Sequence, residues 1–311
     1  MIMKKNYLRM LSAIQSCGLA FMTLTLLMPL ATQAQEVQTV VSTVEVGDVT
    51  MTVNPTKGGR IMSLKYKGQE VISQLSAPES FGSTFWTSPQ KVWNWPPVRE
   101  FDKGIYQVEE HDGRLVMTSE VSQKLKYRVR KEFTTDEKDH AIIITYSIIN
   151  ESDETRQVAP WEITRVVNDG GTVFFDAPLD SITPAGLMPF KAAHGAVWYQ
   201  SDETFQNRKI NANGKGWYAY YSKGLLLLKK FPDLPSPGQG SQEAAPAPGE
   251  AEIQVYVNRG KTFIELESQG AYTTLKPHER LDWTVRWYLL PVEADVPSKE
   301  LMETVKTVLH L

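Results

Sequence analysis

Two glutamates near the C-terminal end are spaced for shared chemistry. Side chains alternate between the two faces of a β-strand, so Glu265 and Glu267 point to one side while Ile264 and Leu266 point to the other. Two carboxylates on one face can bind ligand hydroxyls, or one of them can serve as a general base. The same spacing fits an exposed strand with ordinary surface acids, so the pattern alone leaves both interpretations open.

A second group of candidates lies in residues 81–97, where three tryptophans and three prolines occur within 17 residues. We expect a stiff loop with no regular element, in which aromatic faces stand beside amides. This combination suits a sugar, whose C–H face stacks on an indole while its hydroxyls bond to amides and carboxylates. Trp93, Trp95, Gln90 and Asn94 are therefore candidate binding residues. The alternative is a loop whose tryptophans plug one end of the fold.

Histidine is the side chain best suited to give and take protons at neutral pH. The five histidines are far apart, and none has metal-ligand spacing. His194 lies in a less regular segment and is kept as a candidate acid. The motifs GxSxG, HExxH, GxGxxG and the P-loop are absent, so we expect no metal and no cofactor. The other four histidines are interpreted as structural or solvent-exposed, because they fit turns, a strand start or the chain end: His111, His140, His278 and His310.

Composition narrows the class of protein. The 311 residues hold 33 Lys and Arg against 36 Asp and Glu, a net charge of −3, which argues against a nucleic-acid partner. A hydrophobic content of 41% allows a large packed core. The single cysteine excludes a disulfide framework and a Cys-rich zinc site.

Residues 1–34 have the pattern of a secretory signal peptide. Lys4, Lys5 and Arg9 give a basic start, and an apolar run of 14 uncharged residues follows. Thr32 and Ala34 occupy the small-residue positions of a signal-peptidase site, so we expect cleavage after Ala34. A membrane anchor is the alternative, but the run is shorter than the roughly 20 residues that a spanning helix needs. The localisation we expect is periplasmic or secreted, without a membrane span.

Cys17 raises the alternative of a lipoprotein, because residues 14–17 loosely resemble the required box. We expect no lipid there, because the apolar run follows Cys17 where it should precede it. Removal of 34 residues leaves 277, with 30 basic and 36 acidic side chains and no cysteine. Thiol catalysis is therefore excluded in the exported chain.

The candidate residues must be positioned by strands, because period-2 alternation recurs through residues 35–311. Residues 125–133 and 142–148 predict a hairpin, and residues 281–289 predict another strand with one solvent-exposed face. Residues 298–311 predict a short helix that begins at Ser298. We expect one all-β domain, a large antiparallel β-sandwich with a short C-terminal helix. The Pro/Gly-rich residues 232–250 are interpreted as a flexible surface loop, with an interdomain linker as the alternative.

Several motifs together resemble the galactose mutarotase-like (aldose 1-epimerase) superfamily. The LESQ string that contains Glu267, followed by Leu275-Lys276-Pro277 and Glu279, is similar to the end of that superfamily. The GGRI segment with Arg60 resembles its early glycine hairpin. The WxSPQxxWxWPP loop and the APWEITR segment resemble a branch found in exported bacterial proteins. The resemblance implies a β-supersandwich with a carbohydrate-sized groove on one sheet.

The resemblance also implies roles for single residues. In the epimerases a glutamate takes the proton from the anomeric hydroxyl and a histidine protonates the ring oxygen, and Glu267 matches that glutamate. In the epimerases the acidic histidine follows a segment that is comparable to residues 160–165 here. These residues include Trp161, Glu162 and Arg165 but no histidine. Arg165 keeps its proton at neutral pH, but it can bind a hydroxyl or a carboxylate.

Three functions remain open. The first is a non-catalytic carbohydrate-binding protein that recognises a mono- or oligosaccharide. Its groove would hold Trp93, Trp95, Trp161, Gln90, Asn94, Glu162, Arg165, Glu265, Glu267 and Arg60. The second is a sugar epimerase with Glu267 as base and His194 as acid. The third is a structural or interaction protein of the cell envelope. The sequence gives neither the sugar nor the oligomeric state.

Overall fold

The computed structural model describes residues 41–76, 79–235 and 244–311. The expected signal peptide, the expected cleavage site after Ala34, and Cys17 lie outside the described residues. So does the middle of the expected loop at residues 232–250. Within the described residues, no helix combines the length and the apolar character that crossing a bilayer requires.

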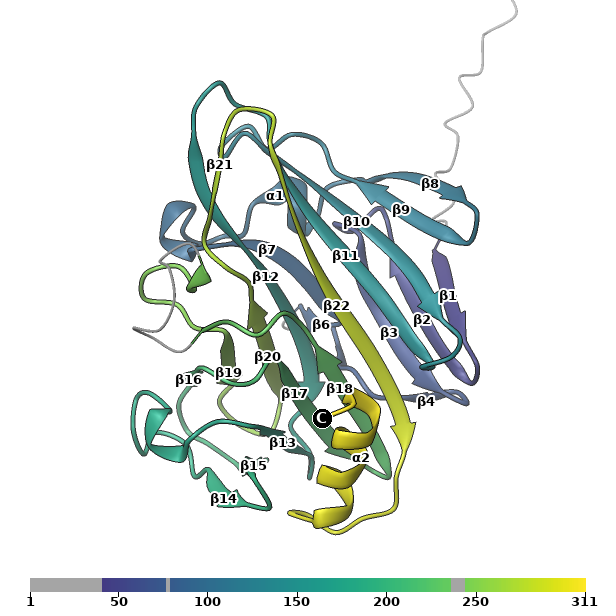
Figure 1. Cartoon of the computed structure of the whole chain (residues 1–311), viewed down its shortest axis with the longest axis vertical. Coiled ribbons are helices and arrows are strands. Elements are labelled where there is room, and N and C mark those ends of the chain that lie inside the picture. The colour runs from purple at the N-terminus through teal and green to yellow at the C-terminus, as the bar shows by residue number, and fades with distance from the viewer. Residues whose placement is uncertain (1–40, 77–78, 236–243) are drawn as a thin grey trace, which may run out of the picture. The chain divides into compact units, whose positions relative to one another are not determined.

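The first sheet has ten antiparallel strands, and its central strands carry the candidate residues (Figure 1). The order is β1-β2-β3-β7-β12-β20-β19-β16, with β4 paired to β3 and β21 paired to β12. Their bounds are β1 Ser42–Val46, β2 Val49–Asn54, β3 Arg60–Tyr66, β4 Gln69–Glu70, β7 Ser83–Ser88, β12 Arg156–Val167, β16 Arg208–Ala212, β19 Ile253–Val257, β20 Phe263–Gln269 and β21 Thr273–Leu275.

The second sheet also has ten antiparallel strands, in the order β14-β15-β13-β17-β18-β22-β11-β10-β9-β8. Its three longest strands, β10, β11 and β22, run side by side (Figure 1), and they contain the predicted hairpin and the predicted strand at residues 281–289. The bounds are β8 Gln107–His111, β9 Arg114–Thr118, β10 Tyr127–Asp136, β11 Ala141–Asn150, β13 Thr172–Phe175, β14 Lys191–Ala193, β15 Ala196–Gln200, β17 Trp217–Ser222, β18 Leu225–Lys230 and β22 Arg280–Pro291.

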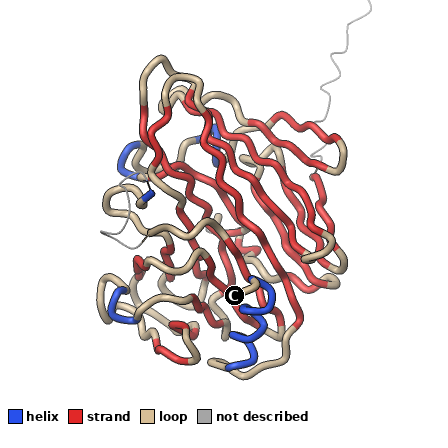
Figure 2. The backbone as a smooth tube through the Cα atoms, in the orientation of Figure 1, coloured by secondary structure: helices blue, strands red, loops and turns tan. Residues whose placement is uncertain are grey.

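The main core lies between the two sheets. Phe85 of β7 stacks on Tyr146 of β11 with ring centroids 4.2 Å apart, which joins the layers directly. The predicted all-β sandwich is confirmed, because strands dominate and the apolar faces of both sheets meet in one buried cluster (Figure 2).

A second, smaller core lies on the outer face of the second sheet. Helix α2 (Lys299–Leu309) buries Leu301, Met302 and Val305 against β17, β18 and β22. The Ser298 side chain accepts the backbone N–H of Leu301, so the predicted start of the C-terminal helix is confirmed.

Residues 81–97 correct one expectation, because six of these 17 residues form strand β7. Strand β7 is buried at every position, so it shows no alternation, and a short apolar run of this kind is hard to recognise. The remaining short elements are β5 Gln74–Leu75, β6 Ser80–Phe81, helix α1 Arg99–Asp102 and the 3₁₀ turns η1 Gln90–Val92 and η2 Leu179–Ser181.

Candidate functional site

Strand β12 decides which side chains face a ligand and which face the core. Glu162 is fully buried and forms an ion pair of 2.7 Å with Lys229 of the second sheet, so its face lies between the sheets. Because side chains alternate, Trp161 and Arg165 point to the outer face. The register of β12 against β20 sets Arg165 opposite Glu265, which puts that carboxylate on the outer face as well.

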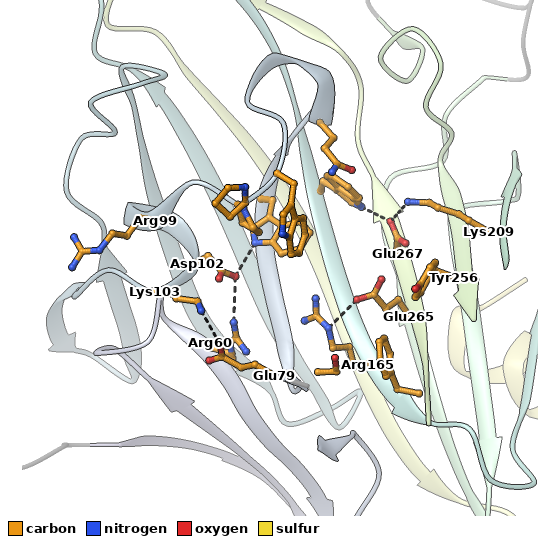
Figure 3. Close-up of a pocket in the computed structure, with 18 residues that line it drawn as sticks. Arg60, Glu79, Arg99, Asp102, Lys103, Arg165, Lys209, Tyr256, Glu265 and Glu267 are labelled. Atoms are coloured by element: carbon orange, nitrogen blue, oxygen red, sulfur yellow. Dashed lines mark hydrogen bonds and ion pairs between the residues drawn. The ribbon is translucent and has the colours of Figure 1, made fainter. Parts of the chain in front are cut away.

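A cavity of about 770 Å³ lies on this outer face. Strands β3, β7, β12, β16, β19 and β20 supply its floor and side. The segment that contains η1 and α1 supplies one wall (Figure 3). A volume of this size is in the range of small-molecule sites.

Glu267 is the most buried acid of the cavity, with 1% of its surface exposed. Its Oε2 accepts the indole N–H of Trp161 at 2.8 Å and the ammonium of Lys209 at 2.8 Å. No hydrogen bond from the described residues reaches Oε1. Burial raises the pKa of Glu267, and the positive charge of Lys209 opposes that shift. The arrangement holds a carboxylate with one oxygen anchored and one oxygen ready for a ligand.

Arg165 and Glu265 form a second charged pair in the cavity floor. The Nε of Arg165 lies 2.9 Å from Oε1 of Glu265, and its Nη1 donates to the Thr84 hydroxyl at 3.2 Å. The guanidinium also lies 5.8 Å from the ring of Trp86. Such a pair has donors and acceptors left for hydroxyl groups.

Tryptophans form the apolar part of the cavity. Trp86, Trp95 and Trp161 line it, and Trp86 meets the other two edge to face with ring centroids 6.3 Å and 5.5 Å away. Trp95 has 72% of its surface exposed, so its ring is open to a ligand. Flat indole faces beside charged groups are the chemistry that sugar rings use.

Arg60 and Asp102 close the opposite end. The Oδ1 of Asp102 accepts the indole N–H of Trp86 at 3.0 Å and the Nη2 of Arg60 at 3.2 Å (Figure 3). Lys103, next in the chain, pairs with Glu79 at 2.7 Å. The short helix α1 therefore brings a carboxylate and a cation to this end of the cavity.

The glycine turn before β3 sets the position of Arg60. The buried ammonium of Lys131 donates to the carbonyl oxygens of Gly58 and Gly59 at 2.7 Å and 2.9 Å. Burial lowers the pKa of Lys131 to about 7. A Cβ on Gly58 would lie 2.4 Å from the carbonyl oxygen of Asp102, so only glycine permits this close approach of the turn to α1.

The structure brings most of the sequence-predicted site residues to one cavity and leaves four outside it. The residues that line it are Arg60, Gln90, Trp95, Trp161, Arg165, Glu265 and Glu267. Trp93 is buried behind Trp161, where its indole N–H donates to the Thr87 carbonyl, so it supports the cavity wall. Asn94 is exposed, with a left-handed φ of 57°, and does not line the cavity.

Two expectations about charged residues need correction. Glu162 faces the core instead of the groove, because it alternates with Trp161 along β12; Tyr146 and Trp287 also donate to its carboxylate. His194 lies exposed in the tight turn between β14 and β15 of the second sheet. No histidine is among the residues that line the cavity, so His194 does not complete a site with Glu267.

Sequence reasoning missed Lys209, Tyr256, Asp102 and Lys103, which all line the cavity. Alternation in residues 253–257 was the signal for Tyr256, since its side chain points away from the buried valines beside it. Lys209 alternates in the same way in β16. Asp102 had no such signal, because a one-turn helix positions it.

The cavity shows no sign of a metal centre. Among residues 41–76, 79–235 and 244–311, no group of three His, Cys, Asp or Glu side chains is arranged to hold a metal ion. The carboxylates that line the cavity are paired with cations or indole N–H groups.

No protein-family model matches the sequence, and no curated protein matches it. Solved structures share the fold. One is an Escherichia coli K12 protein assigned as an aldose 1-epimerase, with a TM-score of 0.58, 15% identity, and coverage of 81% of this chain and 99% of that one. A galactose mutarotase-like protein from Lactobacillus casei has a TM-score of 0.57 at 12% identity, with 81% and 100% covered.

A third neighbour, an aldose epimerase homologue from Caenorhabditis elegans, has a TM-score of 0.52 at 9% identity, with 82% and 100% covered. At such low identity the likeness concerns the fold. The chain has the galactose mutarotase-like fold, as the sequence resemblance predicted.

Proposed function

We propose that this protein binds a saccharide in the cavity on the outer face of the first sheet. The observation that supports the proposal most is the meeting of the exposed Trp95 indole with hydrogen-bonding charged groups in one cavity. The exposed ring of Trp95 can stack on the C–H face of a sugar ring. Glu265, Glu267 and Arg165 can bond to its hydroxyls. The mutarotase-like fold of the chain agrees with a ligand of this class.

The binding proposal is tested by isothermal titration of the full-length protein with a panel of aldoses and short oligosaccharides. We expect at least one saccharide to bind, and the same saccharide to raise the melting temperature through its preference for the folded state. A matched inert polyol such as glycerol controls for general stabilisation. Absence of binding by every saccharide in the panel would contradict the proposal.

A sugar epimerase is the second candidate, and the Glu267–Lys209 pair favours it. Burial raises the pKa of Glu267, which makes its carboxylate a better base for the anomeric proton. Lys209 lies 2.8 Å from that carboxylate and lines the cavity. Its ammonium can therefore give a proton to the ring oxygen when the bond between C1 and the ring oxygen breaks and the sugar ring opens. This assigns the acid role to Lys209.

Polarimetry separates the two candidates. If the protein is an epimerase, it accelerates the mutarotation of an aldose that it binds, and Glu267→Gln abolishes the acceleration. If the wild-type protein binds the sugar without acceleration, the epimerase candidate is wrong and the binding function stands.

We also propose that the chain acts outside the cytoplasm, in the periplasm or after secretion. The support is the basic start, the apolar run and the small residues before position 35.

A further inference from the structure

We propose that the saccharide of this cavity carries an acidic group, a carboxylate or a sulfate or phosphate ester, and that Arg60 binds it. The inference rests on the proposed saccharide-binding function and specifies its ligand. The observation behind it is that the buried Arg60 side chain, at the α1 end of the cavity, has too few hydrogen-bond acceptors.

Arg60 is an incompletely paired buried cation. Only 4% of its surface is exposed, and its one hydrogen-bonding partner is Asp102, at 3.2 Å from Nη2. Its Nε and Nη1 are buried and have no partner among the described residues. A guanidinium carries one N–H on Nε and two on Nη1, so three donors are left without an acceptor. Buried donors without acceptors are costly, and native proteins rarely leave them so.

The Arg60 side chain borders the cavity at the α1 end (Figure 3). One face of its guanidinium lies over the Phe81 ring, 4.7 Å from the ring centroid. The two carboxylates nearby are already engaged. Asp102 accepts from Trp86 as well as from Arg60, and Glu79 pairs with Lys103 at 2.7 Å.

The charge of the cavity favours an anion over a neutral hydroxyl. Its lining has one more cation than carboxylate, although the whole chain carries a net charge of −3. The ion pair with Asp102 leaves the Nε and Nη1 groups of Arg60 without an acceptor, and a neutral hydroxyl oxygen can accept from them. An anionic oxygen accepts the same N–H groups in stronger, charge-assisted hydrogen bonds.

The test compares matched sugars that differ only in the acidic group. Isothermal titration is run with glucose against glucuronate, glucose 6-sulfate and glucose 6-phosphate, and with galactose against galacturonate. We expect at least one acidic member to bind about tenfold or more tightly than its neutral partner, as a hydrogen bond to a charged group allows. The three glucose derivatives show which anionic group is preferred. Acetate, sulfate and phosphate alone are titrated as controls.

The possible failures are distinguishable. If a neutral sugar binds and no acidic derivative binds more tightly, the acidic-ligand inference is wrong and the binding function stands. If no saccharide of either kind binds, the binding function itself is wrong. If the free anions bind as tightly as the acidic sugars, the site recognises the ion and not the saccharide.

Arg60→Gln should weaken binding of the acidic sugar about tenfold more than binding of its neutral partner, so that the ratio of the two affinities falls towards one. Arg280→Gln is the matched control, because Arg280 also pairs with one aspartate, Asp282, but lies outside the cavity lining. A preference that survives Arg60→Gln contradicts the inference. Should Arg60→Gln fail to fold, the wild-type ratio of acidic to neutral affinity still decides.

Discussion

Trp95 separates ligand binding from folding more cleanly than the other cavity residues do. It exposes 72% of its surface, whereas Trp86 and Trp161 are buried. We expect Trp95→Ala to weaken saccharide binding up to about tenfold, because it removes a stacking face worth about 1 kcal/mol. The free energy of unfolding should change by no more than about 1 kcal/mol. Isothermal titration and urea denaturation measure the two effects.

Phe205 provides the matched control for Trp95. It is an aromatic residue with 97% of its surface exposed, and it does not line the cavity. Phe205→Ala should therefore leave the saccharide affinity unchanged. Equal losses of affinity in both variants would show that Trp95 does not stack on the ligand.

The Glu267–Lys209 pair predicts a pH-dependent stability. In the unfolded chain Glu267 titrates near its ordinary value of 4.5, and in the folded protein burial raises its pKa. Lys209→Met removes the cation that opposes this rise, so the folded pKa rises further. Between the two values the folded protein holds a proton that the unfolded chain has lost, and the free energy of unfolding falls as the pH rises.

Lys209→Met should therefore cost about 2 kcal/mol at pH 7 and much less below pH 4.5, where Glu267 is protonated in both states. Urea denaturation of wild type and variant at pH 4, 5.5 and 7 measures the difference. Lys276→Met, at an exposed lysine, controls for the general loss of a positive charge. A penalty that is equal at all three pH values would mean that the pair does not govern Glu267.

Alternation along β12 places Trp161 and Arg165 on one face and Glu162 on the other, so the three residues cannot all line one groove. What alternation cannot give is the face that meets the core. The Glu162–Lys229 ion pair across the sheets decides this, and it joins residues 67 positions apart.

At the scale of elements, the glycine turn before β3 and the helix α1 position each other. Gly58 has φ of +69°, and an added Cβ would lie 2.4 Å from the carbonyl of Asp102. We expect Gly58→Ala to lower the free energy of unfolding by about 3 kcal/mol, from backbone strain and a clash with backbone. Displacement of α1 should also weaken saccharide binding, because Asp102 and Arg60 would move apart.

Gly68→Ala isolates the contribution of the clash. Gly68 has φ of +85°, but a Cβ there would have no neighbour within 4 Å. This variant should cost about 1 kcal/mol from strain alone and leave the affinity unchanged. Thermal unfolding and titration of the two variants side by side check both expectations. If Gly68→Ala costs as much as Gly58→Ala, the contact with α1 is not what requires glycine.

The order of strands in the first sheet explains which site residues the sequence could not supply. Tyr256 reaches the cavity because β19 pairs with β20, and Lys209 because β16 pairs with β19. Alternation gives the face of each residue within its strand, but no local pattern predicts that β16 pairs with a strand more than 40 residues later. Asp102 enters from α1, which has only four residues and too little length for a helical period.

At the scale of the whole molecule, the sandwich could be predicted because the long strands of its second sheet have one solvent-exposed face. Residues 125–133, 142–148 and 281–289 alternate clearly, and all three lie in the second sheet. The first sheet is harder to recognise. Its strand β7 is buried on both faces, one of them beneath the segment that forms the cavity wall. The site is thus formed where the sequence pattern is weakest.

The N-terminal leader carries the prediction that concerns the whole chain. Its apolar run of 14 residues is too short for the roughly 20 that span a bilayer, and Thr32 and Ala34 suit a signal peptidase. Expression of the full-length chain in bacteria should yield a periplasmic or secreted product that begins at Gln35 and contains 277 of the 311 residues. Intact-mass spectrometry of the fractionated cells measures this.

Two variants distinguish the forms of processing. Ala34→Lys should block cleavage, because a long charged side chain does not fit the small-residue position. Cys17→Ala should be processed like the wild type, because the apolar run lies after Cys17 and not before it. A product that begins at Cys17 with added lipid mass would show that the chain is a lipoprotein and would contradict cleavage after Ala34. An uncleaved chain in the cytoplasm would refute export, and the saccharide would then have to be sought among cytoplasmic sugars.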